Sequence, residues 1–302
     1  MLSPWTLLIL ALCTLLNLHL ASSKPTRARP RPPPEKLTEL RAHRALRPLR
    51  TLNRTSLSSR TTQEEKEVQY STNWAGAVLD PLPNSTYAFV SATITVPTPT
   101  PTSSSDSDSD SDSASTYQAA SAWLGIDGAT YATAILQTGI DIYVIDGEGY
   151  TDAWYEWYPD FARYFDEFAV LPGDVLVASV NASFTPDANG RSGGADHGVC
   201  IMENLTSGES VTTTVSAPKS TATLAGLNAE WVVEDYSSGG EAVPFVGFGE
   251  VRFEGCAAGL GDGREVGLDG EQMEVYELVL GGVVAAGVEV GGDGVVVTRE
   301  GV

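Results

Sequence analysis

A glutamine stands in the middle of the apolar stretch AILQTGI, residues 134–140. The stretch predicts a buried strand, where an amide without hydrogen bonds is costly. Gln137 is therefore a candidate for chemistry, because a fixed N–H can stabilise negative charge that develops in a transition state. Carboxylates, which can move protons in acid–base catalysis, occur in two further stretches, YTDAWYEWYPD at 150–160 and NAEWVVEDY at 228–236.

Alternation groups these side chains, because residues two apart in a strand project from the same side. The shared faces carry Ile135, Gln137, Gly139 and Asp141; then Asp152, Trp154, Glu156 and Tyr158; then Glu230, Val232 and Glu234. Apolar side chains, including Trp231 and Val233, take the opposite face of the third stretch. We predict that one face covers a core and the other lines a groove with carboxylates, aromatic rings and an amide.

Such a groove suits more than one chemistry. A Glu with a Gln could hydrolyse peptides in acid, whereas two Glu flanked by aromatic rings could cleave a glycosidic bond. A carbohydrate-binding module would need the same surface without catalysis. These residues alone leave the three alternatives open.

Other catalytic classes lack their residues. The histidines are His19, His43 and His197, and the last lies in the loop-like GGADHG. The sequence contains no HExxH and no Asp-Thr-Gly or Asp-Ser-Gly element. We therefore expect no Ser-His-Asp triad, no pepsin-like dyad, no metal and no cofactor.

The elements around these residues predict an all-β domain over 67–302. All 30 glycines fall at or after Gly76, and short runs rich in Val, Thr, Tyr and Trp alternate with turn residues. This pattern is typical of a sandwich or barrel. The repetitive Asp/Ser segment at 102–115 predicts a solvated loop.

The N-terminal part reads differently. An apolar run from Leu7 to Leu20 predicts a signal peptide at 1–23, with a membrane anchor as the alternative. Residues 24–66 hold 12 basic and 4 acidic residues, whereas the rest of the chain holds 6 basic and 35 acidic ones. We interpret 24–66 as a basic propeptide with one short amphipathic helix that includes Leu37, Leu40 and Leu46. A disordered basic tail is the alternative.

Secretion bears on two further features. Cys200 and Cys256 remain after the signal peptide is removed, and in a secreted protein two cysteines are expected to pair. Sequons at Asn53, Asn84, Asn181 and Asn204 predict a glycoprotein.

The motifs STNWAGAVL, AWLGIDG, TAILQTGIDIY, YTDAWYEWYPD and NAEWVVEDY resemble those of the eqolisins, the glutamic peptidases of filamentous fungi. The resemblance covers roughly residues 70 to 256. It implies a concanavalin-like sandwich of two antiparallel sheets, and a secreted monomeric acid endopeptidase that acts on polypeptides and binds neither nucleic acid nor membrane. It also implies that Gln137 and Glu234 are catalytic, and that Trp74, Asp141, Trp154 and Glu156 line the substrate groove.

The opposite charges of the two segments add one expectation about regulation. A basic propeptide laid along an acidic groove would be held there at neutral pH and loosened as the carboxylates are protonated. We therefore expect the propeptide to inhibit the peptidase domain of its own chain.

Overall fold

The computed structural model describes residues 34–52, 68–102, 117–184, 193–269 and 272–301. The predicted signal peptide, the sequon at Asn53 and nearly all of the Asp/Ser segment lie outside these ranges. Within them, no helix is both long and apolar enough to cross a bilayer.

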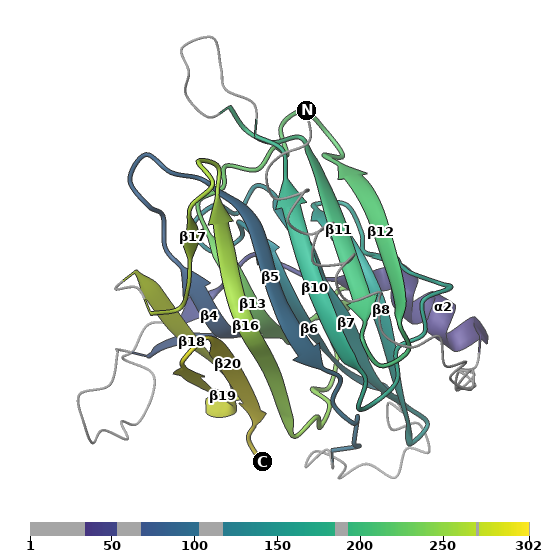
Figure 1. Cartoon of the computed structure of the whole chain (residues 1–302). Coiled ribbons are helices and arrows are strands. Elements are labelled where there is room, and N and C mark those ends of the chain that lie inside the picture. The colour runs from purple at the N-terminus through teal and green to yellow at the C-terminus, as the bar shows by residue number, and fades with distance from the viewer. Residues whose placement is uncertain (1–33, 53–67, 103–116, 185–192, 270–271, 302) are drawn as a thin grey trace.

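Two antiparallel layers form the body of the protein (Figure 1). In the first layer the strands are ordered β9 (Arg163–Tyr164), β8 (Glu148–Tyr158), β7 (Ile135–Ile145), β6 (Tyr117–Ile126), β13 (Ala229–Glu234), β4 (Trp74–Leu79) and β18 (Met273–Leu280). In the second the order is β12 (Glu209–Ser216), β11 (His197–Asn204), β10 (Val175–Ala182), β5 (Tyr87–Thr95), β16 (Glu250–Leu260), β20 (Gly294–Arg299) and β19 (Val283–Gly291). Pairing of β18 with β19 joins the layers, and the predicted sandwich is confirmed.

Short strands complete the sheets. Strand β17 (Glu265–Val266) pairs with β16, and β3 (Gln69–Ser71) pairs in parallel with β18. Strand β2 (Thr51–Leu52), from the basic segment, adds to β3. A separate small sheet contains β1 (Arg44–Ala45), β14 (Ser237–Ser238) and β15 (Glu241–Ala242). The basic segment therefore pairs with the domain at both ends of its extended part.

The helix of the basic segment is shorter than predicted. It is α2, Pro34–His43, and it includes Leu37 and Leu40 but not Leu46. The helix ends because Arg44 and Ala45 pair with Ser238 and Ser237 instead of continuing the helical hydrogen bonds. Leu46 then lies buried in an extended stretch, with 2% of its surface exposed.

Alternation along the first layer separates two apolar clusters. Leu124, Leu136, Trp157 and Val233 face β5, β10 and β11 and belong to the core between the layers. The other face carries Trp74, Trp123, Trp154, Tyr143 and Tyr236, together with Leu46 from the basic segment. Helix α2 lies on this outer side (Figure 1). The two-faced sheet predicted from the sequence is confirmed.

The predicted cysteine pair does not form. Cys200 and Cys256 are both buried and free. Cys200 lies on β11 and Cys256 on β16, and β10 and β5 run between these strands. Because neighbouring strands are about 4.8 Å apart, the two cysteines are roughly 14 Å apart across the sheet, beyond the reach of a disulfide.

Candidate active site

Gln137 lies on β7 directly opposite Glu156 on β8. Its Nε2 donates to Glu156 Oε1 at 3.1 Å, and its buried Oε1 has no hydrogen-bond partner among the described residues. On the other side it faces Gly125, where an added Cβ would lie 3.1 Å from the Gln137 Cβ and 3.1 Å from the Trp123 ring. A glycine in β6 thus leaves room for the amide.

Glu156 is the carboxyl that orients this amide. Its Oε1 accepts from Gln137 and its Oε2 lies 3.2 Å from Arg44 Nη1. Burial raises the pKa of Glu156 to about 7, although Arg44 and Gln137 both act to lower it. With one Nε2 hydrogen held by Glu156, the second amide hydrogen is left for another acceptor.

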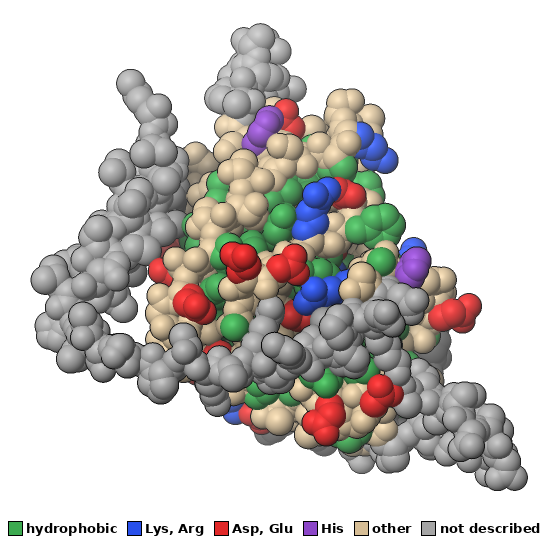
Figure 2. Space-filling view, turned by 90° about the vertical axis from the view of Figure 1, so that its right-hand side faces the viewer, with side chains coloured by type: hydrophobic (Ala, Val, Ile, Leu, Met, Phe, Trp, Pro, Cys, Tyr) green, Lys and Arg blue, Asp and Glu red, His purple; other side chains and the backbone are tan. Residues whose placement is uncertain are grey.

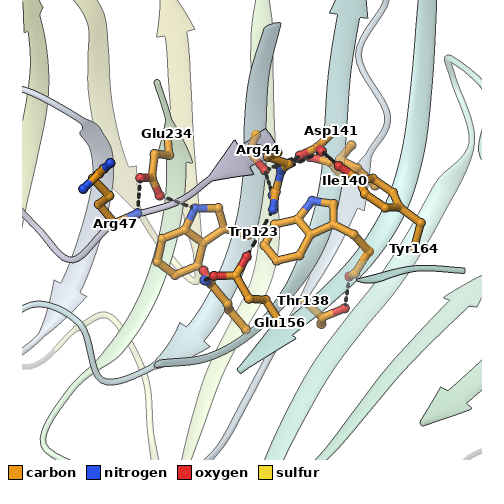
Figure 3. A network of polar contacts seen from close by, with 12 residues as sticks. Arg44, Arg47, Trp123, Thr138, Ile140, Asp141, Glu156, Tyr164 and Glu234 are labelled. Carbon is orange, nitrogen blue, oxygen red and sulfur yellow. Dashed lines mark hydrogen bonds and ion pairs between the residues drawn. The ribbon is translucent and has the colours of Figure 1, made fainter. Parts of the chain in front are cut away.

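Glu234, the last residue of β13, lies in the same groove from the opposite side (Figure 3). Its Oε2 accepts from Trp123 Nε1 at 3.2 Å, and its Oε1 accepts from Asn73 Nδ2 at 3.4 Å. The Oε1 atom also accepts from the backbone N–H of Arg47 at 2.9 Å. Burial raises the pKa of Glu234 well above its usual range, and the charge of Arg44 opposes this rise.

Asp141 lies two residues after Gly139 on β7, on the same face of the strand, and hydrogen-bond donors surround it. Ser121 Oγ donates to Oδ1 at 2.7 Å, while Tyr143 and Tyr164 donate to Oδ2 at 2.7 and 2.6 Å. Arg44 Nε lies 2.7 Å from Oδ2. These contacts fix the carboxylate beside the groove rather than leaving it as a free base.

Tryptophans form the walls of the groove. Trp74 and Trp123 meet edge to face with 5.0 Å between ring centroids. Trp74 Nε1 donates to the carbonyl of Arg47 at 3.0 Å, and the Trp154 ring lies 4.0 Å from the Arg44 guanidinium. The rings therefore contact both the backbone and a side chain of an extended peptide segment.

The structure brings together every residue predicted for the site: Gln137, Glu234, Trp74, Asp141, Trp154 and Glu156. All are buried. The basic segment contacts Glu234 and Trp74 through Arg47, and Asp141, Glu156 and Trp154 through Arg44. Sequence reasoning missed Trp123, although alternation in AWLGIDG places it on the same face as Gly125. It also missed Asn73 and Arg44; nothing in their spacing distinguishes Asn73 from a turn residue or Arg44 from neighbouring arginines.

The fold and the site define a glutamic peptidase, a hydrolase of peptide bonds. Residues 72–299 match the model of the Peptidase A4 family, and the chain belongs to that family of eqolisins. Aspergillopepsin-2 of Aspergillus niger is 39% identical over 242 residues, covering 79% of each chain. Scytalidopepsin B of Scytalidium lignicola is 38% identical over 215 residues, covering 69% of this chain and 71% of its own.

Solved structures agree with the sequence relatives. Scytalido-glutamic peptidase with a transition state analog inhibitor is similar with a TM-score of 0.62 and 32% identity, over 76% of this chain and 98% of that one. Aspergilloglutamic peptidase from Aspergillus niger gives a TM-score of 0.51 and 40% identity, over 61% of this chain and 99% of that one. The glycosidase and carbohydrate-binding alternatives are accordingly set aside.

Proposed function

We propose that this chain is the zymogen of a secreted acid endopeptidase in which Glu234 and Gln137 act on the scissile peptide bond. The observation that carries this proposal is the 2.9 Å contact between Glu234 Oε1 and the backbone nitrogen of Arg47. A peptide amide nitrogen is the atom that needs a proton when the bond breaks. Glu234 already lies within hydrogen-bond reach of such an atom in an extended segment.

The reaction follows from general acid–base chemistry. Glu234 takes a proton from water as the water oxygen bonds to the carbonyl carbon, and the carbonyl oxygen becomes an oxyanion. The Gln137 amide hydrogen that Glu156 does not hold donates to this oxyanion. The carbon–nitrogen bond then breaks as Glu234 returns the proton to the leaving nitrogen, which restores the carboxylate.

We assign Glu234 rather than Glu230 as the base because, among the described residues, Glu234 is the one of the two that has a hydrogen bond to the extended segment. Glu230 is fully buried four residues earlier in β13, and its neighbouring charge is Asp127. A related structure holds a transition state analog inhibitor, which supports a groove built for a tetrahedral centre. Trp74 and Trp154 would position the substrate backbone and side chains, and Asp141 and Glu156 would hold the polar groups in place.

The test compares Glu234→Gln with Glu230→Gln in the secreted protein, using casein hydrolysis at acid pH. Glu234→Gln should remove nearly all turnover, and Glu230→Gln should be milder. Far-ultraviolet circular dichroism on both variants checks that each is folded. Loss of turnover in Glu230→Gln with retention in Glu234→Gln would overturn the assignment.

We also propose that residues 24–66 form an inhibitory propeptide and that 67–302 is the mature monomeric domain. The described part, 34–52, covers Glu234, Trp74 and Trp154, which supports inhibition by occlusion. The signal at 1–23 would direct secretion. Asn84 is an exposed sequon, whereas Asn204 is buried and its amide donates to Asp174, which leaves Asn204 poorly placed for a glycan.

A further inference from the structure

Four arginines recur every third residue in the basic segment, at 41, 44, 47 and 50, yet they make different contacts. Arg44 is buried, with 1% of its surface exposed, whereas Arg47 and Arg50 are exposed. Arg47 and Arg50 contact the domain through their backbones: the Arg50 N–H donates to Asn73 Oδ1 at 2.9 Å. Their charges therefore face solvent, and the charge of Arg44 does not.

The Arg44 guanidinium contacts several strands of the first layer at once (Figure 3). Nε lies 2.7 Å from Asp141 Oδ2 on β7, and Nη1 lies 3.2 Å from Glu156 Oε2 on β8. Nη2 donates to Ser121 Oγ on β6 at 3.1 Å. The Trp154 ring covers one side at 4.0 Å, so both charged partners are groove carboxylates.

Other titratable groups face the same guanidinium. They are Tyr117 on β6, Tyr164 on β9, Tyr236 just after β13, and the carboxyl of Glu234. Burial raises the pKa of each of these phenols above its usual range. The phenols are therefore neutral at and below neutral pH, and only carboxylates supply counter-charge to Arg44 among the described residues that face it.

Arg41 makes a second, more exposed anchor. Its Nη2 lies 2.8 Å from Asp152 Oδ2, and its guanidinium lies 4.3 Å from the Tyr164 ring. Its side chain is 21% exposed, against 1% for Arg44. Figure 2 shows acidic and basic side chains next to one another on this side of the molecule. Solvent therefore reaches the Arg41 guanidinium but does not reach that of Arg44.

A buried cation persists only while its counter-charges are ionised, because an uncompensated charge in an apolar site is strongly unfavourable. We propose that Arg44 is the residue that locks the zymogen: its buried guanidinium, paired with the carboxylates of Asp141 and Glu156, holds the basic segment in the groove. This inference rests on the proposed function of the groove. It names one side chain, rather than the net charge of the segment, as the regulator.

Arg44 acts to lower the pKa of Glu156, so the ionised carboxylate and the Arg44 guanidinium favour each other. Burial has the larger effect and raises that pKa to about 7. The ion pair and the burial of Glu156 therefore change docking in opposite directions as the pH falls, and substitution of Arg44 isolates the ion pair.

Burial also predicts how salt acts. Attraction between exposed charges is screened within about 10 Å at 0.1 M salt, whereas a buried pair is screened much less. A latch that depended on the net charge of the segment would loosen in high salt. A latch held by Arg44 should not.

The experiment uses hydrogen–deuterium exchange of the intact full-length chain, read by mass spectrometry on backbone amides of residues 44–50. At pH 7, Arg44→Gln should speed exchange there by about ten-fold or more, since local opening controls exchange. The matched controls Arg47→Gln and Arg50→Gln remove the same charge from exposed positions and should exchange like wild type. Equal effects of all three substitutions, or no effect of Arg44→Gln, would overturn the proposal.

Wild-type protein gives an independent measurement if Arg44→Gln is not secreted. After correction for intrinsic rates, protection of residues 44–50 should stay constant between 0.1 and 1 M salt at pH 7, because a buried pair is screened little. Protection that falls with salt would overturn the proposal. Exchange requires no turnover, so a separate casein assay distinguishes failure of the lock from failure of the proposed peptidase function.

Discussion

The two faces of the first layer are buried to a similar extent but contain different chemistry. On the core face, Leu136 and Val233 pack among aliphatic and aromatic side chains. One residue further along the same strands, Gln137 and Glu234 are buried among tryptophans, tyrosines and carboxyls. Burial of apolar surface stabilises the fold, whereas burial of a carboxyl works against it. Adjacent residues on one strand therefore serve stability on one side and chemistry on the other.

The largest expected effect comes from the groove face. Gln137→Ala should lower kcat by about a hundred- to a thousand-fold, as loss of one oxyanion donor does elsewhere. The melting temperature should change little, because Gln137 makes one side-chain hydrogen bond in the described residues. Casein hydrolysis by the acid-activated variant and thermal unfolding measure the two quantities.

The double variant with Glu234→Gln sharpens this prediction. If the two residues act as one unit, the double variant should lose little more activity than the more damaged single variant. Additive losses would show that Gln137 and Glu234 contribute to separate steps.

The matched change on the core face is Leu136→Ala, one residue before Gln137. Leu136 is fully buried between the layers, so its truncation should lower the free energy of unfolding by about 2–5 kcal/mol. Activity per folded molecule should stay close to wild type. Urea unfolding and active-site-normalised casein hydrolysis test this, and a large drop in activity without loss of stability would contradict the division between faces.

Buried carboxyls predict that stability of the full chain depends on pH. Burial raises the pKa of Glu156 to about 7, of Asp235 to about 7 and of Asp127 to about 6. Folded protein therefore binds more protons than unfolded protein between the unfolded carboxyl pKa near ~4 and these values. Stability is full below that range and falls as the pH rises through about 7.

Thermal unfolding from pH 4 to pH 7 checks the direction of this change. Glu230→Gln provides the comparison, since burial and Asp127 raise the pKa of Glu230 well above its usual range. Removing this carboxyl should flatten the fall in melting temperature. A melting temperature that rises over the same interval would contradict the prediction.

The smallest expected effect is that of thiol reagents. Cys200 and Cys256 are buried on the core side of the second layer, and burial raises the pKa of both thiols, that of Cys256 to about 12. Thiolate is the reactive form, so iodoacetamide should leave the folded protein and its activity unchanged. Alkylation of both residues should appear only in denaturant, which mass spectrometry detects; loss of activity in the folded state would contradict this.

Alternation predicted the groove because it depends only on local geometry. The side-chain period of two placed Gln137, Glu156 and Glu234 on one face, and the register of β7 with β8 confirms the first pair. The same rule could not predict that Cys200 and Cys256 stay apart, since their separation depends on the order of strands in the second layer.

The basic segment was harder to predict. Leu46 has helical spacing from Leu40, but pairing of Arg44 with Ser238 ends the helix before it. Four equally spaced arginines are equivalent in sequence, and only the strands that meet around Arg44 make it different. Contacts between residues 97 and 112 positions apart decide this, and no local pattern reports them.

The basic segment and the domain belong to one covalent chain, and this link decides whether the segment can return to the groove after it leaves. While both belong to one chain, the segment meets the groove at an effective concentration in the millimolar range, as short tethers give. Weak docking is then enough to keep the groove occupied. If the chain is cleaved once within residues 53–67, this effective concentration is replaced by the concentration of the free peptide in solution, which is much lower. Once diluted, the cut segment would not rebind, so opening of the groove becomes a one-way step.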